Sequence, residues 1–429
     1  MEQRIKIALV SHTFQINYYA RRWQLFAQEH PDIDVTLLTP SVVKWYPKKD
    51  YSYGNSKTTT GKEVDEGNFH VRLIKPIFKR SFLSWNIRSV LKDIKPDIFY
   101  HVGFHTQISL VQIGLIMGHY FPKSKLILHS MRGPNFDLKI DKTPCSAKEW
   151  VMRRLMYCYY SAIWRYVKKH YKAVFCHYPD AVECFRKEGY KGPIYMQTQV
   201  GVNTEWFHPD EAARKEIRDK YNSGDAFVFG SASRFSEEKG VDDILRALPK
   251  EGDWKYLMMG AGSNAETDRL KQIIKERGIE DKVIITGFVD WYDITKYWNA
   301  IDCAIHVPRT TNHWVETFSL SAIQPQASHK PVIGNTSGSV PYQIGLDEMI
   351  VPEGDIEALH NKIEWVLSHP LEVQKIADMM YNRTINSFSV KHLNDMFYDT
   401  LIEDVMNGEY DEEKSDMTKY TPKNHTINA

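Results

Sequence analysis

Short apolar runs rich in β-branched residues alternate along the chain with longer stretches of helical periodicity. This alternation is typical of α/β proteins, in which a helix carries the chain from one parallel strand to the next. In the first half, the apolar runs predict strands over residues 5–10, 34–39, 97–102, 125–129 and 173–176. The stretches of helical periodicity between them are residues 17–28, 84–93, 107–117 and 148–169.

A second series of the same kind begins near residue 226. It predicts strands over 226–231, 255–259, 283–286, 303–306 and 331–333, and helices over 241–248, 265–277, 318–328 and 356–367. The turn-rich segment GVNTEWFHPDEAARK between the two series is interpreted as a linker, and the polar residues 44–67 as a long loop or an irregular hairpin. We therefore predict an α/β protein with two doubly wound, Rossmann-like domains that face each other across a cleft.

The domain boundaries follow from these series. Residues 1–200 are predicted to form the N-terminal domain and residues 201–388 the C-terminal domain. A last helix over 390–406 follows a break at 386–389, and the segment 389–408 is expected to cross back to the N-terminal domain. The charged residues 409–429 contain little apolar material and are expected to form a flexible tail.

Composition narrows the class of protein. Of the 429 residues, 42% are apolar and 25% charged, as in globular proteins with large cores. The 55 Lys and Arg residues balance 54 Asp and Glu residues, so no overall positive field draws the chain to nucleic acid. The 5 cysteines form no Cys-x-x-Cys pair, which favours a reducing compartment and argues against a zinc site.

Targeting signals are also not recognisable. The N-terminal apolar run is too short for a signal peptide, and the longest apolar stretch, residues 108–117, is far shorter than the ~20 residues of a membrane span. We expect a cytoplasmic protein that can touch the inner face of a membrane but does not cross it.

The loops that follow strands hold the candidate chemistry, because ligands of open parallel sheets bind beyond the carboxyl ends of the strands. After the strand at 226–231, SRFSEEKG places Arg234 and Lys239 just before a helix, an arrangement suited to a diphosphate. The alternative is a solvated loop in which Glu237 and Glu238 neutralise the same cations.

Two further loops carry candidates. After the strand at 255–259, GAGSNAE is a Gly-rich turn, in which Gly260 and Gly262 either approach a ligand or only form a tight turn. After the strand at 303–306, Glu316 lies at the start of a helix, and Gln324 follows eight residues later on nearly the same face. The alternative for Glu316 is a favourable helix cap.

Taken together, GVNTEWFHP, RFSEEKG, the Gly-rich turn, VIITGFV and ETFSLSAIQPQASHKPVI followed by TSGSVP resemble the family 4 glycosyltransferases in order and spacing. The resemblance covers residues 200–367 well and the N-terminal half in outline. It implies the GT-B fold and the retaining transfer of a sugar from a nucleotide-sugar donor to a glycan or a lipid-linked acceptor. Two departures stand out: Gln324 occupies the position of a second family glutamate, and SHTFQINYY replaces the Gly-rich loop after the first strand.

The resemblance implies roles for the residues of the C-terminal domain. Arg234 and Lys239 would hold the donor diphosphate and stabilise the charge that develops on this leaving group, without a metal ion or any cofactor beyond the nucleotide-sugar co-substrate. Glu316 would contact hydroxyl groups of the donor sugar. Gln324 would accept a hydrogen bond from the nucleotide ribose, less strongly than a carboxylate. The remaining donor-binding positions would be the N–H groups of Phe318, Ser319 and Leu320 and the turn at Gly260 and Gly262.

The N-terminal domain would supply the acceptor site and a histidine near the reacting anomeric carbon. His129, which ends the predicted strand in LILHSMRGP, matches the family position and is expected to be catalytic together with Glu316. His101 and His105, in DIFYHVGFH, are the second choice. The only Asp-x-Asp string, Asp32–Asp34, is interpreted as a solvated strand entry.

Two functions remain open at this stage. One is the glycosyltransferase, and the other is a non-catalytic GT-B protein that binds a nucleotide sugar or a glycan. The second is suggested by Gln324 and the missing Gly-rich loop, whereas the joint presence of Arg234, Lys239 and Glu316 favours the enzyme.

The helix predicted over 148–169 adds a question about the acceptor. Projection at 100° per residue gives an apolar face of Met152, Met156, Tyr159, Ile163, Tyr166 and Val167, and a second face of Trp150, Arg154, Arg165, Lys168 and Lys169. A further basic and aromatic stretch, KPIFKRSFLSWNIR, lies earlier in the chain. Either the apolar face is core and the basic face solvated, or the domain rests on an anionic membrane and receives a lipid-linked acceptor there.

Overall fold

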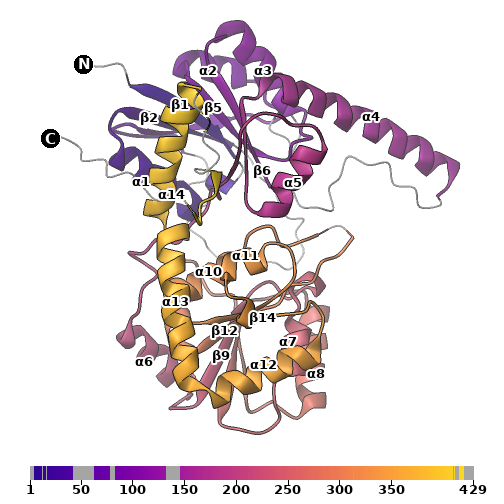
Figure 1. The fold of residues 1–429 in the computed structure, drawn as a ribbon, viewed down its shortest axis with the longest axis vertical. Helices are drawn as coiled ribbons and strands as arrows, with labels where there is room; N and C mark the ends of the chain where they lie inside the picture. Colours follow the sequence, from indigo (N-terminus) through magenta and orange to yellow (C-terminus); the bar gives the residue numbers. More distant parts are fainter. Residues whose placement is uncertain are drawn as a thin grey trace. The chain divides into compact units, whose positions relative to one another are not determined.

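The computed structural model describes residues 4–11, 13–15, 17–41, 62–77, 83–131, 145–312, 314–408, 410 and 415–419. The described chain divides into two compact units (Figure 1). The first unit contains the described residues up to 198 and those from 394 onward, and the second contains residues 199–393.

The sheet of the first unit has the strand order β3-β4-β2-β1-β5-β6-β7-β8. Every neighbouring pair is parallel except β3 and β4. The strands are β1 (Ile5–Val10), β2 (Ile33–Pro40), β3 (Val64–Glu66), β4 (Phe69–Ile74), β5 (Ile98–Gly103), β6 (Lys125–Ser130), β7 (Ala173–Cys176) and β8 (Ile194–Met196). The order reverses between β1 and β5, which makes this a doubly wound sheet with its ligand crevice expected at that point.

The helices of this unit are α1 (Asn17–Glu29), α2 (Ile87–Ile94), α3 (Ser109–Tyr120), α4 (Ala147–His170) and α5 (Pro179–Lys187). All strands and helices predicted for the first half are present, with shifted ends. The sequence reading missed β4, β8 and α5, whose apolar runs are short. Most of the predicted loop 44–67 lies outside the described residues, and its end contains β3.

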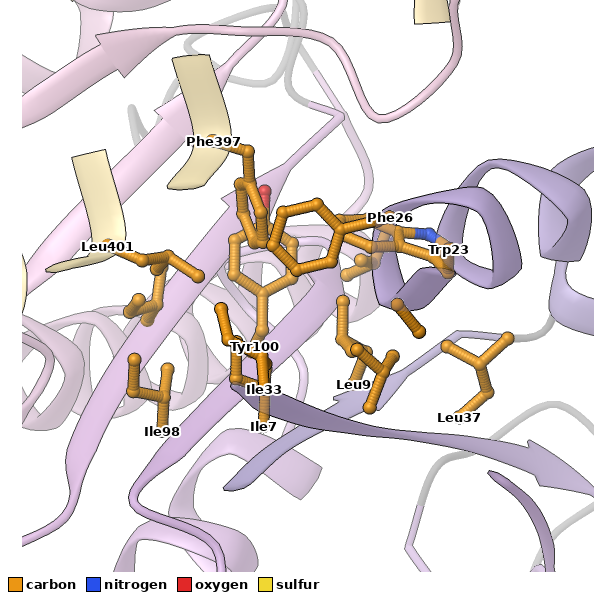
Figure 2. Close-up of a cluster of buried hydrophobic side chains, with 14 of the residues drawn as sticks. Ile7, Leu9, Trp23, Phe26, Ile33, Leu37, Ile98, Tyr100, Phe397 and Leu401 are labelled. Carbon is orange, nitrogen blue, oxygen red and sulfur yellow. The ribbon is translucent and has the colours of Figure 1, made fainter. Parts of the chain in front are cut away.

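The C-terminal part of the chain completes the core of the first unit (Figure 2). Helix α14 (Val390–Asp399) continues into a π-helix, η5 (Thr400–Met406). The ring of Phe397 packs edge-on against Trp23 of α1 at a centroid distance of 4.9 Å, and it also meets Tyr100 of β5. Residues separated by almost the whole sequence therefore share one hydrophobic cluster.

Replacing Phe397 by alanine is expected to lower the free energy of unfolding of this unit by about 3–5 kcal/mol, because the fully buried ring leaves a cavity among aromatic neighbours that cannot collapse. Urea unfolding measures the change. The control is Tyr410→Ala, which removes a ring that is 39% exposed in the same C-terminal region. Equal losses for the two variants would contradict the packing role of Phe397.

The second unit has a six-stranded, fully parallel sheet in the order β11-β10-β9-β12-β13-β14. Its strands are β9 (Phe227–Ala232), β10 (Trp254–Met259), β11 (Val283–Gly287), β12 (Cys303–His306), β13 (Val332–Asn335) and β14 (Ile350–Val351). The order reverses between β9 and β12. The prediction of two doubly wound α/β domains is confirmed by the two sheets.

The helices of the second unit are α6 (Glu211–Lys220), α7 (Val241–Ala247), α8 (Asn264–Arg277), α9 (Ile294–Ala300), α10 (Leu320–Ala327), α11 (Val340–Ile344), α12 (Ile356–Ser368) and α13 (Pro370–Phe388). Local signals explain several ends. Ser263 caps α8 by accepting from the N–H of Glu266, and Gly278 ends the same helix in the left-handed conformation.

Two interpretations of connecting segments need correction. The proposed linker at 201–215 belongs to the second unit: Asp210 caps α6, and Val202 bridges Ser389. In the proposed flexible tail, Asp416 forms a bridge with Met196, the last residue of β8, and Met417 is fully buried. Apolar Met417 is a sufficient reason for this part of the tail to be ordered.

Candidate active site

The strongest candidate site lies where the strand order of the second sheet reverses. Strand β9 leads into the loop that carries Arg234, β10 leads into Gly260, and β12 ends at His306. Because these strands are parallel neighbours, their carboxyl ends open on the same edge of the sheet. This edge is where ligands of doubly wound sheets bind.

Lys239, Glu316 and His306 meet at this edge. The Lys239 Nζ donates to Glu316 Oε2 at 2.7 Å, and His306 Nε2 lies 3.8 Å from the same oxygen. Glu316 and His306 are buried. The Lys239 ammonium also stands 4.3 Å from the centre of the Trp314 ring, which holds it by a cation–π contact.

The charges of this group are mutually adjusted. Burial alone would raise the pKa of Glu316, but Lys239, His306 and more weakly Arg234 outweigh it, so the pKa of this carboxyl is below its usual 4.5. Burial lowers the pKa of His306 to about 4. At neutral pH the group therefore contains a carboxylate, an ammonium and a neutral imidazole.

Arg234 is the second cation of the predicted diphosphate clamp. Its guanidinium is 41% exposed and pairs with Glu238 at 3.2 Å, so the interpretation in which the glutamates of this loop neutralise its cations is correct for this pair. Lys239 instead pairs with Glu316. Arg234 also lowers the pKa of Glu316, more weakly than Lys239 does, which agrees with the prediction that the two cations serve one site.

The backbone of Glu316 is fixed by the TSGSVP segment. Ser339 donates its N–H to the carbonyl of Glu316 at 2.9 Å. Gly338 has φ +50°, and a Cβ on it would lie 2.1 Å from that same carbonyl oxygen. A glycine is therefore required for this close approach, which sets the position of the Glu316 side chain.

A pocket of about 220 Å³ lies at the same ends of β9 and β10, and Arg234 lines it. Its apolar part comes largely from the loop and helix after β11, including Phe288, Val289, Trp291 and Ile294. Gly260, Leu320, Ser321 and Gln324 lie around it as well. An apolar pocket beside paired cations suits a ligand with a flat ring system and an anionic group.

Gln324 is buried at this pocket, and its Oε1 accepts from the Trp298 indole N–H at 3.1 Å. The amide is therefore oriented by α9 before any ligand binds. This contact explains how a neutral residue is accommodated at the position, since the indole supplies the hydrogen-bond donor that its carbonyl oxygen needs.

The predicted cradle of backbone N–H groups is wrong for Ser319. Its N–H donates to Gln343 Oε1 at 2.8 Å, and Gln343 Nε2 donates back to the Ser319 carbonyl at 2.8 Å. The Gln343 side chain thus replaces a ligand at that position. Leu320 lines the pocket, whereas the Phe318 ring packs on Phe388 at 5.9 Å.

The glycines of the Gly-rich turn allow two loops to touch. Gly260 has φ +147°, and a Cβ there would lie 1.8 Å from the carbonyl oxygen of Ser233. Gly262 forms a β-bridge with Phe235, and a Cβ on Gly262 would lie 2.5 Å from the carbonyl oxygen of Phe235. Gly260 lines the pocket, so it serves both the turn and the site, and the contacts of Gly262 are those of a tight turn.

The predicted catalytic histidine belongs to the first unit, where it is fully buried. His129 Nδ1 lies 2.5 Å from the Tyr100 hydroxyl, and its Nε2 lies 3.4 Å from His177 Nε2. As placed here, His129 is part of the core, so its role near an anomeric carbon stays a prediction. His101 contacts Ser109 at 3.0 Å and His105 packs edge-on against Trp164, and both are also buried.

The loop that replaces the Gly-rich segment after β1 contains a 3-10 turn, η1 (Thr13–Gln15). Phe14 in this turn is buried against Trp23 at a centroid distance of 6.4 Å. The segment that stands in place of the family's Gly-rich loop is therefore held to its unit by the buried Phe14 ring.

Sequence reasoning missed His306, Trp298, Trp314 and the aromatic side of the pocket. The segment GFVDWYDI directly follows β11, so its aromatic residues could have been assigned to the strand-end edge. Nothing comparable marks Trp298, because it comes from within a helix.

No three or more His, Cys, Asp or Glu side chains of the described residues gather closely enough to hold a metal ion. No helix in the described part of the chain combines the length and apolar character required to cross a bilayer.

Comparison with known proteins finds a family model that matches most of the second unit. Residues 213–385 match the family model described as glycosyl transferases group 1. A GDP-mannose-dependent alpha-(1-6)-phosphatidylinositol monomannoside mannosyltransferase of Mycolicibacterium smegmatis is 27% identical over 178 residues, which are 40% of this chain and 46% of that protein. The protein of the same name from Mycobacterium tuberculosis is 30% identical over 150 residues, 34% of this chain and 38% of that protein. The match thus spans less than half of each relative.

Solved structures resemble the whole chain in fold. Sucrose-phosphate synthase of Thermosynechococcus elongatus has a TM-score of 0.68 at 16% identity, covering 95% of this chain and 100% of that one. The HepE protein of Anabaena in complex with UDP has a TM-score of 0.64 at 16% identity, covering 93% of this chain and 100% of that one.

Proposed function

We propose that this chain, whose residues 213–385 belong to the glycosyl transferases group 1 family, moves a sugar from a nucleoside-diphosphate sugar to a glycan or lipid-linked acceptor. The reaction that we propose retains the anomeric configuration and needs no metal ion or further cofactor. The observation that carries the proposal is the group of Arg234, Lys239 and Glu316 at the carboxyl ends of β9 and β12, beside an apolar pocket.

The proposed donor lies with its diphosphate on Arg234 and Lys239. Cleavage of the sugar–phosphate bond builds negative charge on the diphosphate, and fixed cations stabilise that charge more in the transition state than before it. Both cations are held in advance, Lys239 by Glu316 and Trp314 and Arg234 by Glu238. Little reorganisation is then required when the bond breaks.

Glu316 is proposed to orient the donor sugar. Its buried carboxylate remains charged because the Lys239 ammonium lies beside it, so it can accept hydrogen bonds from sugar hydroxyl groups. The His306 ring, neutral at pH 7, lies 3.8 Å from this carboxylate and is buried with it.

The pocket is proposed to hold the nucleoside, with the base against the aromatic residues after β11 and the ribose near Gln324. The names of the mycobacterial relatives include GDP-mannose as donor and a phosphatidylinositol mannoside. They support a nucleoside-diphosphate sugar as the donor class and a lipid-linked glycan as one acceptor class. We further propose that the protein works in the cytoplasm, at the inner face of the membrane when its acceptor is lipid-linked.

The test combines binding and turnover. Thermal unfolding is measured with UDP, GDP and ADP, and the nucleotide sugars of the base that binds are then assayed for hydrolysis, with and without EDTA. We expect one diphosphate to raise the unfolding midpoint and its sugar to be hydrolysed slowly with retained configuration, regardless of EDTA. Binding without hydrolysis or transfer would favour a nucleotide-sugar-binding protein instead, and no binding would contradict both.

Gln324→Glu is expected to tighten nucleotide binding by up to about tenfold or to leave it unchanged, because a carboxylate can accept from Trp298 and from a ribose hydroxyl together. Calorimetric titration with the nucleotide that binds measures the effect. Gln272→Glu, on the exposed side of α8, adds the same charge away from the site as a control. A loss of more than tenfold would mean that the Gln324 amide donates to the nucleotide.

A further inference from the structure

The N-terminal half of α4 exposes an apolar surface that nothing in the described chain covers. Six large side chains between residues 150 and 159 are 44–60% exposed. They are Trp150, Val151, Met152, Leu155, Met156 and Tyr159. Figure 1 shows α4 extending away from the sheet of its unit.

The two halves of α4 differ in what holds them. In the second half, Ile163, Trp164 and Val167 are buried, and the Trp164 indole donates to the carbonyl of Glu188 at 3.2 Å. The first half has a capping box between Ser146 and Glu149 as its local support. Interpretation of the whole apolar face as core is therefore correct for Ile163 and Val167 and wrong for Met152, Met156 and Tyr159.

The exposed apolar side chains are gathered on one side of the helix. At 100° per residue, Val151, Met152, Leu155, Met156 and Tyr159 fall within an arc of about 140°. Trp150 and Arg154 lie outside this arc and stack on one another at 5.0 Å. A helix with an apolar arc and a basic, aromatic remainder is suited to lie in the plane of a membrane interface.

The positive charge of α4 favours an anionic partner for this surface. The helix contains six Lys or Arg residues and one acidic residue, and that residue, Glu149, is engaged in the capping box. The whole chain carries a formal net charge of only +1, so this basic character is local. A second copy of the helix would bring like charges within the screening length of about 8 Å, whereas an anionic bilayer offers opposite charge and apolar depth together.

We propose that the N-terminal half of α4, residues 147–160, docks on an anionic lipid bilayer. Its apolar arc inserts among the acyl chains while Arg154, beside the arc, and Lys148, in the first turn at the N-terminal end of the same face, contact the headgroups. A bilayer needs no groove to receive a single convex helix, and Tyr and Trp are favoured at its interface. A protein docked in this way would take a lipid-linked acceptor from the same bilayer, a step that rests on the proposed function.

The test is sedimentation of the full chain with vesicles of phosphatidylcholine, alone or with about 30% phosphatidylglycerol. Binding is measured at low and at physiological salt. We expect at least tenfold stronger binding to the anionic vesicles, reduced by salt. M152Q/L155Q/M156Q should lose about thirtyfold or more. K148Q/R154Q should lose about twenty-five-fold, at roughly fivefold per charge. The control L371Q/M379Q replaces apolar residues of α13 that are 76% and 46% exposed and should bind like the parent.

Failure of the docking proposal is distinguishable from failure of the proposed function. Hydrolysis of a nucleotide sugar in the absence of vesicles should be the same for the parent and the α4 variants, and circular dichroism verifies that they fold. No binding to anionic vesicles at low salt, or equal binding by M152Q/L155Q/M156Q, would overturn the proposal. A change from dimer to monomer in this variant without vesicles would also overturn it, by assigning the surface to a second copy. Vesicle binding without any nucleotide-sugar turnover would leave docking intact and contradict the enzyme.

Discussion

Lys239→Ala is expected to slow sugar transfer by about a hundredfold or more, the size of the effect when one preorganised charge donor is removed from a transition state. The same change should weaken nucleoside-diphosphate binding by at least about tenfold, since a charge-assisted hydrogen bond contributes about 1.5–3 kcal/mol. Binding of the nucleoside without phosphates should be nearly unchanged. In addition, the variant leaves the Glu316 carboxylate buried without its 2.7 Å partner.

This second consequence makes the prediction specific to the observed pair. Without Lys239, burial dominates and the pKa of Glu316 should rise, so that the residual activity of the variant should increase with pH where that of the parent is flat. The chain offers a matched control in Lys362→Ala, because Lys362 stands over the Trp365 ring at 4.6 Å much as Lys239 stands over Trp314. If Lys239→Ala bound UDP and GDP like the parent, the diphosphate assignment would be wrong.

Arg234→Ala should have a smaller effect on the same two measurements, about tenfold each. Its guanidinium is 41% exposed, so water weakens its interaction with a phosphate relative to that of Lys239, which is 15% exposed. Glu238→Gln provides the companion variant, because it releases Arg234 from its partner without removing the cation. Larger losses for Arg234→Ala than for Lys239→Ala would reverse the proposed division between the two cations.

The sequence carried most of the information about the fold because strands that are buried on both faces are continuous apolar runs. β1, β5, β6 and β10 are of this kind, and their ends were predicted to within a few residues. Of the strands that were missed, β8 and β14 are only three and two residues long, whereas β4 has six residues interrupted by polar side chains. Their pairing is decided by neighbours distant in sequence, which local periodicity does not report.

For the site, the sequence identified charged residues but not their partners. Arg234, Lys239 and Glu316 could be proposed from their places after strands, yet the pairing of Lys239 with Glu316 across 77 positions depends on the sheet order. The same limit applies to Ser319, whose N–H is taken by Gln343, and to Gln324, whose partner Trp298 comes from α9. Burial was equally hidden, as the two halves of α4 demonstrate: they share one pattern, but only the second half is covered.

Three of the buried histidines in the first unit, His101, His129 and His177, should make it sensitive to moderate acid because burial lowers their pKa values. Burial lowers the pKa of His101 to about 3 and that of His177 to about 4. Burial, then His177 and the buried Arg22, hold the pKa of His129 well below 6.5. The contacts agree with a neutral pair, since His129 can accept from the Tyr100 hydroxyl at Nδ1 while it donates from Nε2 to His177.

The free energy of unfolding of this unit should therefore fall by about 6 kcal/mol between pH 7 and pH 5, a change comparable with the whole stability of a typical domain. In the unfolded chain each of the three histidines takes up a proton near pH 6.5, whereas in the folded unit it stays neutral. Protonation of each histidine therefore stabilises the unfolded state by about 2 kcal/mol at pH 5. The stability is fully present above pH 6.5 and is lost as the pH falls toward the lower folded-state pKa values. In the second unit, His306 is a group of this kind, and its effect alone should be about a third as large. Urea titrations at pH 7, 6 and 5, with pulsed hydrogen exchange to assign each transition to a unit, measure both slopes. His177→Gln should reduce the slope of the first unit by about one proton, and a first unit that keeps its stability at pH 5 would show that these histidines are protonated within the fold.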